Sequence, residues 1–304
     1  MGHSSLYIAL ALWAFAAFAA AAGEPPSWNE TWGSLKDLEA VLRSVPEGEA
    51  VLEAAQRKDP AILRRIKLGR ASYTESTFSR TYSLIDGKEQ IVLKHEITLS
   101  TRLPLSDAVV DLAHELVHFT EKGMLDPYRP GFELEQFVRN GIEGDGGELA
   151  ALAVECKVAW ALERAKDGFP RHRLCQRYRR KGDGFAREMA RRDYYAMGTW
   201  FREAEKELRS AVSELNDGEV VFTSSYAGKP YPLALAEEFE ATRTTACLNN
   251  RRKYRLIAAQ TGSDRVPASV ELMRERMRLK AYDRLYCGSV KADEAGGIEV
   301  KVKD

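Results

Sequence analysis

A helix predicted for residues 105–122 constrains the fold of this chain more than any other segment. Ser106 is a favourable N-cap residue for its start, and Gly123 is a favourable residue for its end. Residues 108–113 are Ala, Val, Val, Asp, Leu and Ala, so one face of this helix is apolar. A helix with such a face packs against the core, and this fixes the direction in which its other side chains point.

Two histidines lie one helical turn apart directly after this apolar run. His114 and His118 project from the same face, because residues four apart in a helix do so. Two imidazoles at this spacing can bind one metal ion at about 2.0–2.1 Å. Glu115 lies beside them, where its carboxylate can hold and deprotonate a metal-bound water without binding the metal. The pattern predicts a hydrolytic metal site, and the alternative is an amphipathic helix with two structural histidines.

The predicted β structure is confined to a hairpin just before this helix. Residues 81–85 and 91–99 have the composition of strands, and Asp86-Gly87 between them is typical of a tight turn. Helices are predicted for most of the remaining chain, at about 34–68, 146–166, 185–215, 233–247, 251–260 and 269–286. The predicted fold class is therefore mainly α with a small β hairpin or sheet (α+β).

The segment His114-Glu115-Leu116-Val117-His118, on a helix that follows a hairpin, resembles the zincin metallopeptidases. The resemblance covers about residues 78–166 and indicates no particular zincin family. It implies that an edge strand beside the helix pairs with an extended peptide substrate. In zincins this edge strand precedes the helix in the sequence, and in this chain the strand at 91–100 has that position. It also implies Zn2+ as cofactor, a peptide or protein as substrate, and hydrolysis in which Glu115 carries a proton from water to the leaving amine.

A catalytic metal of this kind needs a third protein ligand, which metzincins take from a third histidine soon after the motif. No histidine follows His118 at that spacing, so the resemblance implies the glutamate-zincin arrangement, with a ligand from a second helix. Glu148 is the preferred ligand, because it opens a helix after a Gly-rich turn and begins a Glu-x-x-Ala pattern. Glu155, two turns later, is the second choice, and otherwise it would hydrogen-bond a ligand histidine. The remaining candidates are Glu143, Asp145 and Glu121.

The sequence departs from the glutamate-zincin pattern at one position. Several of these families have Asp four residues after the ligand glutamate, whereas this chain has Leu152. The residue that orients the histidine must therefore come from elsewhere. A donor to the oxyanion is also expected, and the candidates, each also readable as a structural residue, are His172, Tyr194, Tyr195 and Tyr231.

The first 22 residues have the pattern of a signal peptide. Residues 6–22 carry no charge and end in Ala20-Ala21-Ala22, which is typical of a cleavage site. No Lys or Arg precedes this run, so an uncleaved membrane anchor is the alternative. We expect a secreted or periplasmic protein with no stable membrane span after cleavage.

Four cysteines follow the predicted signal peptide. An even number in an exported chain favours two disulfides, and the alternative is buried free thiols. Of the three possible pairings, the sequential one is preferred, Cys156 with Cys175 and Cys247 with Cys287. No two cysteines have the close spacing of a zinc site, so a cysteine-based metal centre is not expected.

Charge argues against a nucleic-acid partner. The chain has 45 Lys and Arg and 45 Asp and Glu, so it has no net charge to attract a polyanion. One basic segment lies at 171–192. The simpler interpretation is a solvated surface, and the alternative is a contact with an anionic substrate or envelope polymer.

These observations predict an exported zinc metallopeptidase. The alternatives are a zincin-fold scaffold protein with a degenerate site and a metal-dependent hydrolase of a non-peptide amide of the cell envelope. A groove along the strand at 91–100 would favour peptides, whereas a closed pocket would favour a small amide. The predicted organisation is a signal peptide (1–22), a linker and helical pad (23–70), a zincin-like catalytic core (71–167), a C-terminal helical region (168–290) and a disordered tail (291–304).

Overall fold

The computed structural model describes residues 27–82, 89–123, 125–204, 206–225, 227–261 and 270–288. The predicted signal peptide, the turn at Asp86-Gly87 and the predicted tail at 291–304 lie outside these ranges.

The described chain is mainly helical with a small mixed sheet, which confirms the predicted fold class at this level. The sheet contains β1 (Lys67–Gly69), β2 (Tyr73–Tyr82) and β3 (Glu89–Ser100), in the order β1-β3-β2. β2 is antiparallel to β3, and β1 is parallel to it. Three residues are too few to show an alternating pattern, so β1 was not predicted.

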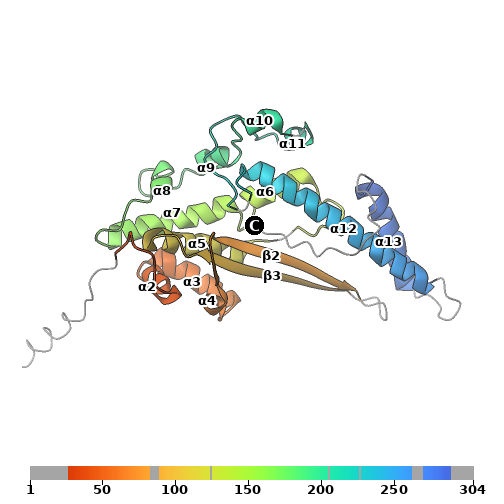
Figure 1. Ribbon diagram of the computed structural model, residues 1–304, viewed down its shortest axis with the longest axis horizontal. Helices are drawn as coiled ribbons and strands as arrows, with labels where there is room; N and C mark the ends of the chain where they lie inside the picture. Colours follow the sequence, from red (N-terminus) through yellow and green to blue (C-terminus); the bar gives the residue numbers. More distant parts are fainter. Residues whose placement is uncertain are drawn as a thin grey trace, which may run out of the picture.

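The β2–β3 hairpin is longer at its start than the sequence suggested. β2 begins at Tyr73, opposite Thr98, rather than near residue 81. Residues 73–80 are mostly polar or aromatic, and they form a strand because β3 offers them a continuous ladder of partners. One end of the hairpin is anchored in the core by Ile97 and Leu99, and the other end projects from the body (Figure 1).

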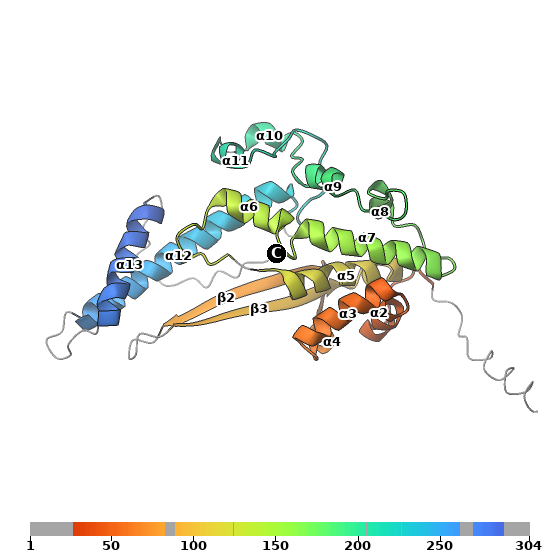
Figure 2. The ribbon, with the colours of Figure 1, turned by 180° about the vertical axis from the view of Figure 1, so that it is seen from behind.

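Helix α5 (Leu105–Glu121) lies at the centre of the molecule. It packs against α7 (Glu148–Ala165) on one side and against α2 (Leu35–Arg43) and α3 (Pro46–Lys58) on the other (Figures 1 and 2). The sheet contacts α5 as well, through β2 and β3. The predicted bounds of α5 and α7 are correct to within one or two residues, because both helices have continuous apolar faces and clear end signals.

The long helix predicted at 185–215 is wrong. The structure has three short helices there, α9 (Arg187–Tyr194), α10 (Trp200–Glu203) and α11 (Lys206–Ala211). Directly after α9 the chain pairs with Asn216, whose amide donates to the carbonyl of Tyr195 at 3.1 Å and whose carbonyl accepts from the amide of Met197 at 2.9 Å. Gly198, with a φ of 52°, then turns the chain. Further short elements are α4 (Ile62–Arg65), α6 (Leu134–Glu143) and α8 (Arg173–Arg177).

The two helices predicted at 233–247 and 251–260 are instead one helix, α12 (Tyr231–Thr261). The polar pair between them does not break the helix, because Asn249 donates to the hydroxyl of Tyr128 at 3.0 Å and Asn250 is buried. Helix α13 (Val270–Tyr286) packs along α12, as Figure 1 shows.

Two disulfides are present, and they have the predicted pairing. Cys156 is bonded to Cys175, and Cys247 is bonded to Cys287. The first links α7 to α8, and the second links α12 to the end of α13. None of the described helices combines the length and the hydropathy that a membrane crossing requires.

Candidate metal centre

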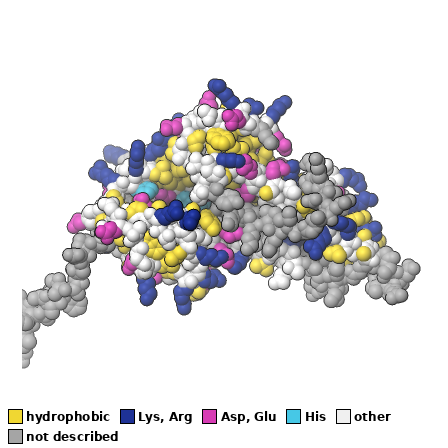
Figure 3. Space-filling view, in the orientation of Figure 1, with side chains coloured by type: hydrophobic (Ala, Val, Ile, Leu, Met, Phe, Trp, Pro, Cys, Tyr) yellow, Lys and Arg dark blue, Asp and Glu magenta, His cyan; other side chains and the backbone are white. Residues whose placement is uncertain are grey.

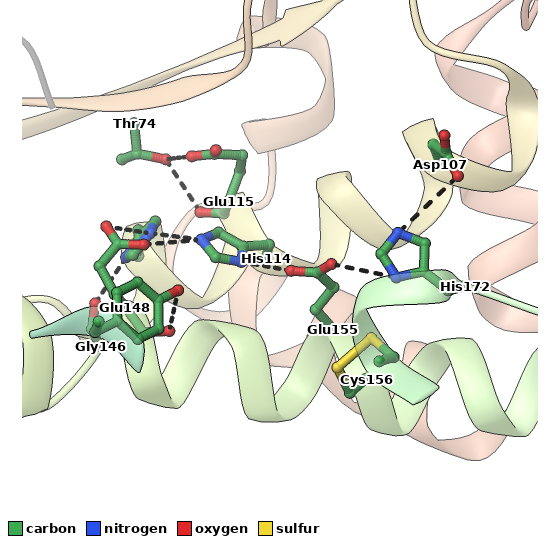
Figure 4. A network of polar contacts seen from close by, with 12 residues as sticks. Thr74, Asp107, His114, Glu115, Gly146, Glu148, Glu155, Cys156 and His172 are labelled. Atoms are coloured by element: carbon green, nitrogen blue, oxygen red, sulfur yellow. Dashed lines mark hydrogen bonds and ion pairs between the residues drawn. A yellow bond between two sulfur atoms is a disulfide. The ribbon is translucent and has the colours of Figure 1, made fainter. Parts of the chain in front are cut away.

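The packing of α5 against α7 brings three predicted ligands together. The Nε2 atoms of His114 and His118 are 3.0 Å apart. The carboxylate of Glu148, the first residue of α7, lies 3.4 Å from Nε2 of His114 and 3.5 Å from Nε2 of His118. Figure 4 shows the side chains of His114 and Glu148 pointing toward each other from α5 and α7.

The hydrogen bonds of the two rings determine which nitrogens carry hydrogen. Nδ1 of His114 is 2.8 Å from Oε2 of Glu155, and Nδ1 of His118 is 2.8 Å from the carbonyl oxygen of Gly146. A carbonyl oxygen and an ionised carboxylate only accept, so both Nδ1 atoms are assigned as donors. In neutral rings the two Nε2 lone pairs then face each other and Glu148, an arrangement that a cation between them would stabilise.

The spacing of these atoms fits a four-coordinate metal ion. Ligands at about 2.0–2.1 Å from a tetrahedral centre are about 3.3 Å from one another. The two Nε2 atoms are 3.0 Å apart, which is close to this value, and the two oxygens of Glu148 lie at similar distances, Oε2 at 3.4 Å from His114 and Oε1 at 3.5 Å from His118. Oε2 of Glu148 is buried, and its contact with Nε2 of His114 is long at 3.4 Å, so this oxygen is available to a metal ion. His114, His118 and Glu148 could therefore hold a metal ion.

Charge and burial act differently on the three ligands. Burial alone would lower the pKa of His114, but hydrogen bonds and charges from Glu148 and Glu155 raise it well above its usual value. Burial lowers the pKa of His118 to about 4. Burial would raise the pKa of Glu148, but the charge of His118 and the hydrogen bond with His114 lower it to about 2. The carboxylate of Glu148 is thus held ionised beside the rings.

Glu115 lies next to these ligands without joining them. Its side chain is buried, and Oε2 accepts a hydrogen bond of 2.6 Å from the hydroxyl of Thr74 on β2. Burial raises the pKa of this carboxyl group to about 8, against the opposing effect of His114. The sequence contains no local signal for the role of Thr74, because the contact joins residues 41 positions apart.

The other predicted ligands have other roles. Glu155 contacts Nδ1 of His114, on the opposite edge of the ring from Glu148. Glu143 accepts hydrogen bonds of 2.7 Å from both Arg191 and Tyr195, so it is held away from the site. Glu121 and Asp145 are exposed, and neither lines the cavity at the metal centre.

A cavity of about 340 Å³ contains the site. Three of the predicted oxyanion donors line it, His172, Tyr194 and Tyr231, whereas Tyr195 does not. The ring of Tyr194 stacks on Phe222 with centroids 3.9 Å apart, so this tyrosine is also part of the core.

The strand beside the cavity is not the predicted one. The strand at 91–100 belongs to β3, which is the middle strand of the sheet. No residue of β3 lines the cavity, whereas Ser72, Tyr73 and Thr74 do. The edge strand at the site is therefore β2, because β1 and β2 pair with the two sides of β3.

Two aspartates that were not predicted from the sequence also line the cavity. Asp107 and Asp111 lie seven and three residues before His114, on the same side of α5. This helical spacing was the signal that could have identified them. Burial raises the pKa of Asp111 to about 6, and a hydrogen bond with Ser72 opposes this shift.

A second group of potential ligands lies nearby and does not form a metal site. It consists of Glu155, His172 and Cys175. The sulfur of Cys175 is bonded to Cys156, so it has no thiolate with which to bind a metal.

In comparisons with known proteins, no protein-family model, no curated protein and no solved structure matched this chain. The fold is mainly helical α+β, and it brings together three residues that could hold a metal ion, with the buried Glu115 beside them.

Proposed function

We propose that this protein is an exported zinc metallopeptidase of the zincin type, with the glutamate-zincin ligand arrangement. The observation that carries the proposal is the convergence of His114, His118 and Glu148 beside Glu115 in one cavity. A site that only bound a metal would have no need of the Glu115 carboxylate, and this favours an enzyme over a scaffold protein.

Zinc is the ion that fits these ligands best. Two imidazoles and one carboxylate are a known catalytic zinc set that leaves one position open. Both rings are oriented through Nδ1 by oxygen acceptors, as ligand histidines usually are. Bound zinc would supply Lewis acidity, which lowers the pKa of water and polarises a carbonyl group.

The residues of the chain supply proton transfer and positioning. Glu115 accepts the proton of the attacking water and then delivers it to the leaving amine. Thr74 holds one oxygen of that carboxylate, and burial makes the carboxylate a stronger base than a solvated glutamate. His172 and Tyr231 line the same cavity, and each can donate a hydrogen bond to the oxyanion.

An extended peptide is the substrate that suits the strand at the site. β2 is an edge strand, and its first residues line the cavity, so a peptide can add to it as a further strand. The two disulfides accord with an oxidising compartment outside the cytoplasm.

One observation favours hydrolysis of a non-peptide amide of the cell envelope instead. The cavity of about 340 Å³ is bounded by several elements and does not continue as a groove along β3. A small amide would fit such a space without pairing with a strand.

Zinc content and peptide hydrolysis together test the proposal. Purified protein should contain close to one zinc ion per chain, and His118→Ala and Glu148→Ala should lose it. Glu115→Gln should keep the metal and lose hydrolysis of a peptide library. His95→Ala, which removes a histidine of β3 that does not line the cavity, serves as the control. A wild type that binds no zinc after exposure to it would refute the proposal, and a zinc-loaded protein that cleaves amides but no peptide would support the alternative.

A further inference from the structure

A second cavity lies beside the one at the metal centre. Its volume is about 730 Å³, and it shares Asp107, His172 and Leu174 with the first cavity. Because these residues line both spaces, the two cavities are adjacent. Figure 3 shows histidine side chains in a hollow on this face of the molecule, with Lys and Arg side chains around its edge.

The two cavities differ in charge. Among the described residues, the lining of the first includes no Lys or Arg and five carboxylates, Asp107, Asp111, Glu115, Glu148 and Glu155. The second is lined by Arg171, Arg173 and Arg177, and the carboxylate of Asp107 is its only acidic group in the described chain. A negatively charged group is therefore favoured in the second cavity and disfavoured in the first.

The three arginines are not equally available. Nε of Arg177 lies 2.8 Å from Asp193, and Nε of Arg171 lies 3.2 Å from Glu163. Arg173 is exposed and has no hydrogen bond or ion pair to any residue in the described ranges. Its guanidinium charge is thus free to bind a ligand.

A disulfide holds these arginines close to the metal centre. Arg173 and Arg177 lie on α8, on either side of Cys175, which is bonded to Cys156 of α7. The residue before Cys156 is Glu155, which contacts the proposed ligand His114. The covalent link therefore holds the backbone of α8 beside the part of α7 that carries Glu155.

We propose that the second cavity is a carboxylate-binding subsite, in which Arg173, aided by Arg171 and Arg177, holds a negatively charged group of the peptide cleaved at the metal centre. This inference rests on the proposed function and names its substrate class, a peptide with a carboxylate near the scissile bond. A guanidinium group suits this role because its planar donors match the two oxygens of a carboxylate.

The carboxylate can come from the C-terminus of the peptide or from an Asp or Glu side chain. Three N-acetylated tetrapeptides of otherwise equal sequence distinguish these sources: one with a free C-terminal carboxylate, its C-terminal amide, and an amide with one internal glutamate. Their binding to zinc-loaded Glu115→Gln protein, which should not cleave them, is measured by titration calorimetry. We expect at least one of the charged peptides to bind about tenfold more tightly than the neutral amide.

Charge reversal then assigns the preference to the cavity. Arg173→Glu should abolish the difference between the charged and neutral peptides. Arg180→Glu makes the same change at an exposed arginine of the same segment that lines neither cavity, and it should leave the difference intact. Both positions are exposed, so neither change should disturb folding.

The outcomes separate this inference from the proposed function. Equal binding of all three peptides, or a preference that survives Arg173→Glu, would overturn the subsite. Tighter binding of a polyanionic glycan that is also lost in Arg173→Glu would overturn the assignment to a peptide. A carboxylate preference in binding, combined with no cleavage by the zinc-loaded wild type, would support the subsite and refute the peptidase.

Discussion

The imidazole of His114 and the carboxylate of Glu155 meet across the interface of α5 and α7, with Nδ1 and Oε2 2.8 Å apart. The contact involves the ring nitrogen that faces away from Glu148, so it orients the ring for a ligand bound at Nε2. We therefore expect Glu155→Gln to weaken zinc binding by about 10- to 100-fold without abolishing it. Competition with a fluorescent zinc chelator measures the change.

Glu135→Gln, at an exposed position of α6, is the matched control and should bind zinc as the wild type does. Unchanged affinity in Glu155→Gln would contradict an orienting role. A loss as complete as that in Glu148→Ala would instead make Glu155 a ligand.

Gly146 orients the second histidine through its backbone. Its carbonyl oxygen lies 2.8 Å from Nδ1 of His118, and its φ is 61°, which few residues other than glycine adopt. A Cβ at this position would lie 2.2 Å from the backbone nitrogen of Lys122. Gly146→Ala should therefore lower the free energy of unfolding by about 1–3 kcal/mol and also weaken zinc binding.

Chemical denaturation and zinc competition measure these two effects in the same protein. Gly123→Ala provides the comparison, because a Cβ there meets no atom within 4 Å. If the two variants were equally stable, the close approach of Gly146 to the end of α5 would be disproved.

The elements that carry His114, His118 and Glu148 were predictable from the sequence, and the residues that support these three side chains were less so. The apolar faces and end signals of α5 and α7 are local properties, so the bounds of both helices could be inferred. The positions of Thr74 and Gly146 depend on tertiary contacts with α5, and no local pattern marks them. The same holds for the second cavity, because its arginines also have the composition of an ordinary solvated segment.

The prediction of strands and short helices failed for a different reason. β1 has three residues, and it exists because β3 offers a partner at Thr98–Ser100. The chain at 185–215 has the periodicity of a long helix, but Gly198 and the pairing of Met197 with Asn216 interrupt it. In both cases a tertiary partner outweighed the local preference.

Zinc binding near neutral pH is expected to release at least one proton. Without metal, Glu148 and Glu155 raise the pKa of His114 well above its usual value, although burial opposes them, so the ring keeps its second proton to a higher pH than a solvated imidazole does. That proton must leave before Nε2 can bind zinc, so the apparent affinity should rise with pH up to the pKa of His114. The carboxyl of Glu115, with a pKa of about 8, adds to the release.

Calorimetric titration with zinc in two buffers of different ionisation enthalpy counts the protons released. The observed binding enthalpy should differ between the buffers, and the difference should be smaller for Glu155→Gln, which lacks one of the charges that raise the pKa. A binding enthalpy that is the same in both buffers would contradict the prediction.

An ion-pair cluster between α12 and α13 should make stability depend on acid pH. The carboxylate of Glu275 lies 2.6 Å from Nζ of Lys253 and 2.6 Å from Arg278. Burial would raise the pKa of Glu275, but hydrogen bonds from Arg278 and Lys253 lower it from 4.5 to about 2. A folded-state pKa below the unfolded value stabilises the protein above about pH 4.5, and this contribution is lost as the pH falls towards 2. At pH 7, Glu275→Gln should therefore lower the free energy of unfolding by up to about 3 kcal/mol.

Urea denaturation at pH 7, 4.5 and 2.5 should show the difference in the free energy of unfolding between Glu275→Gln and the wild type shrinking as the pH falls. Glu271→Gln, at an exposed position on the same helix, should match the wild type at every pH, and an equal effect of the two variants would show that the cluster around Glu275 contributes nothing specific.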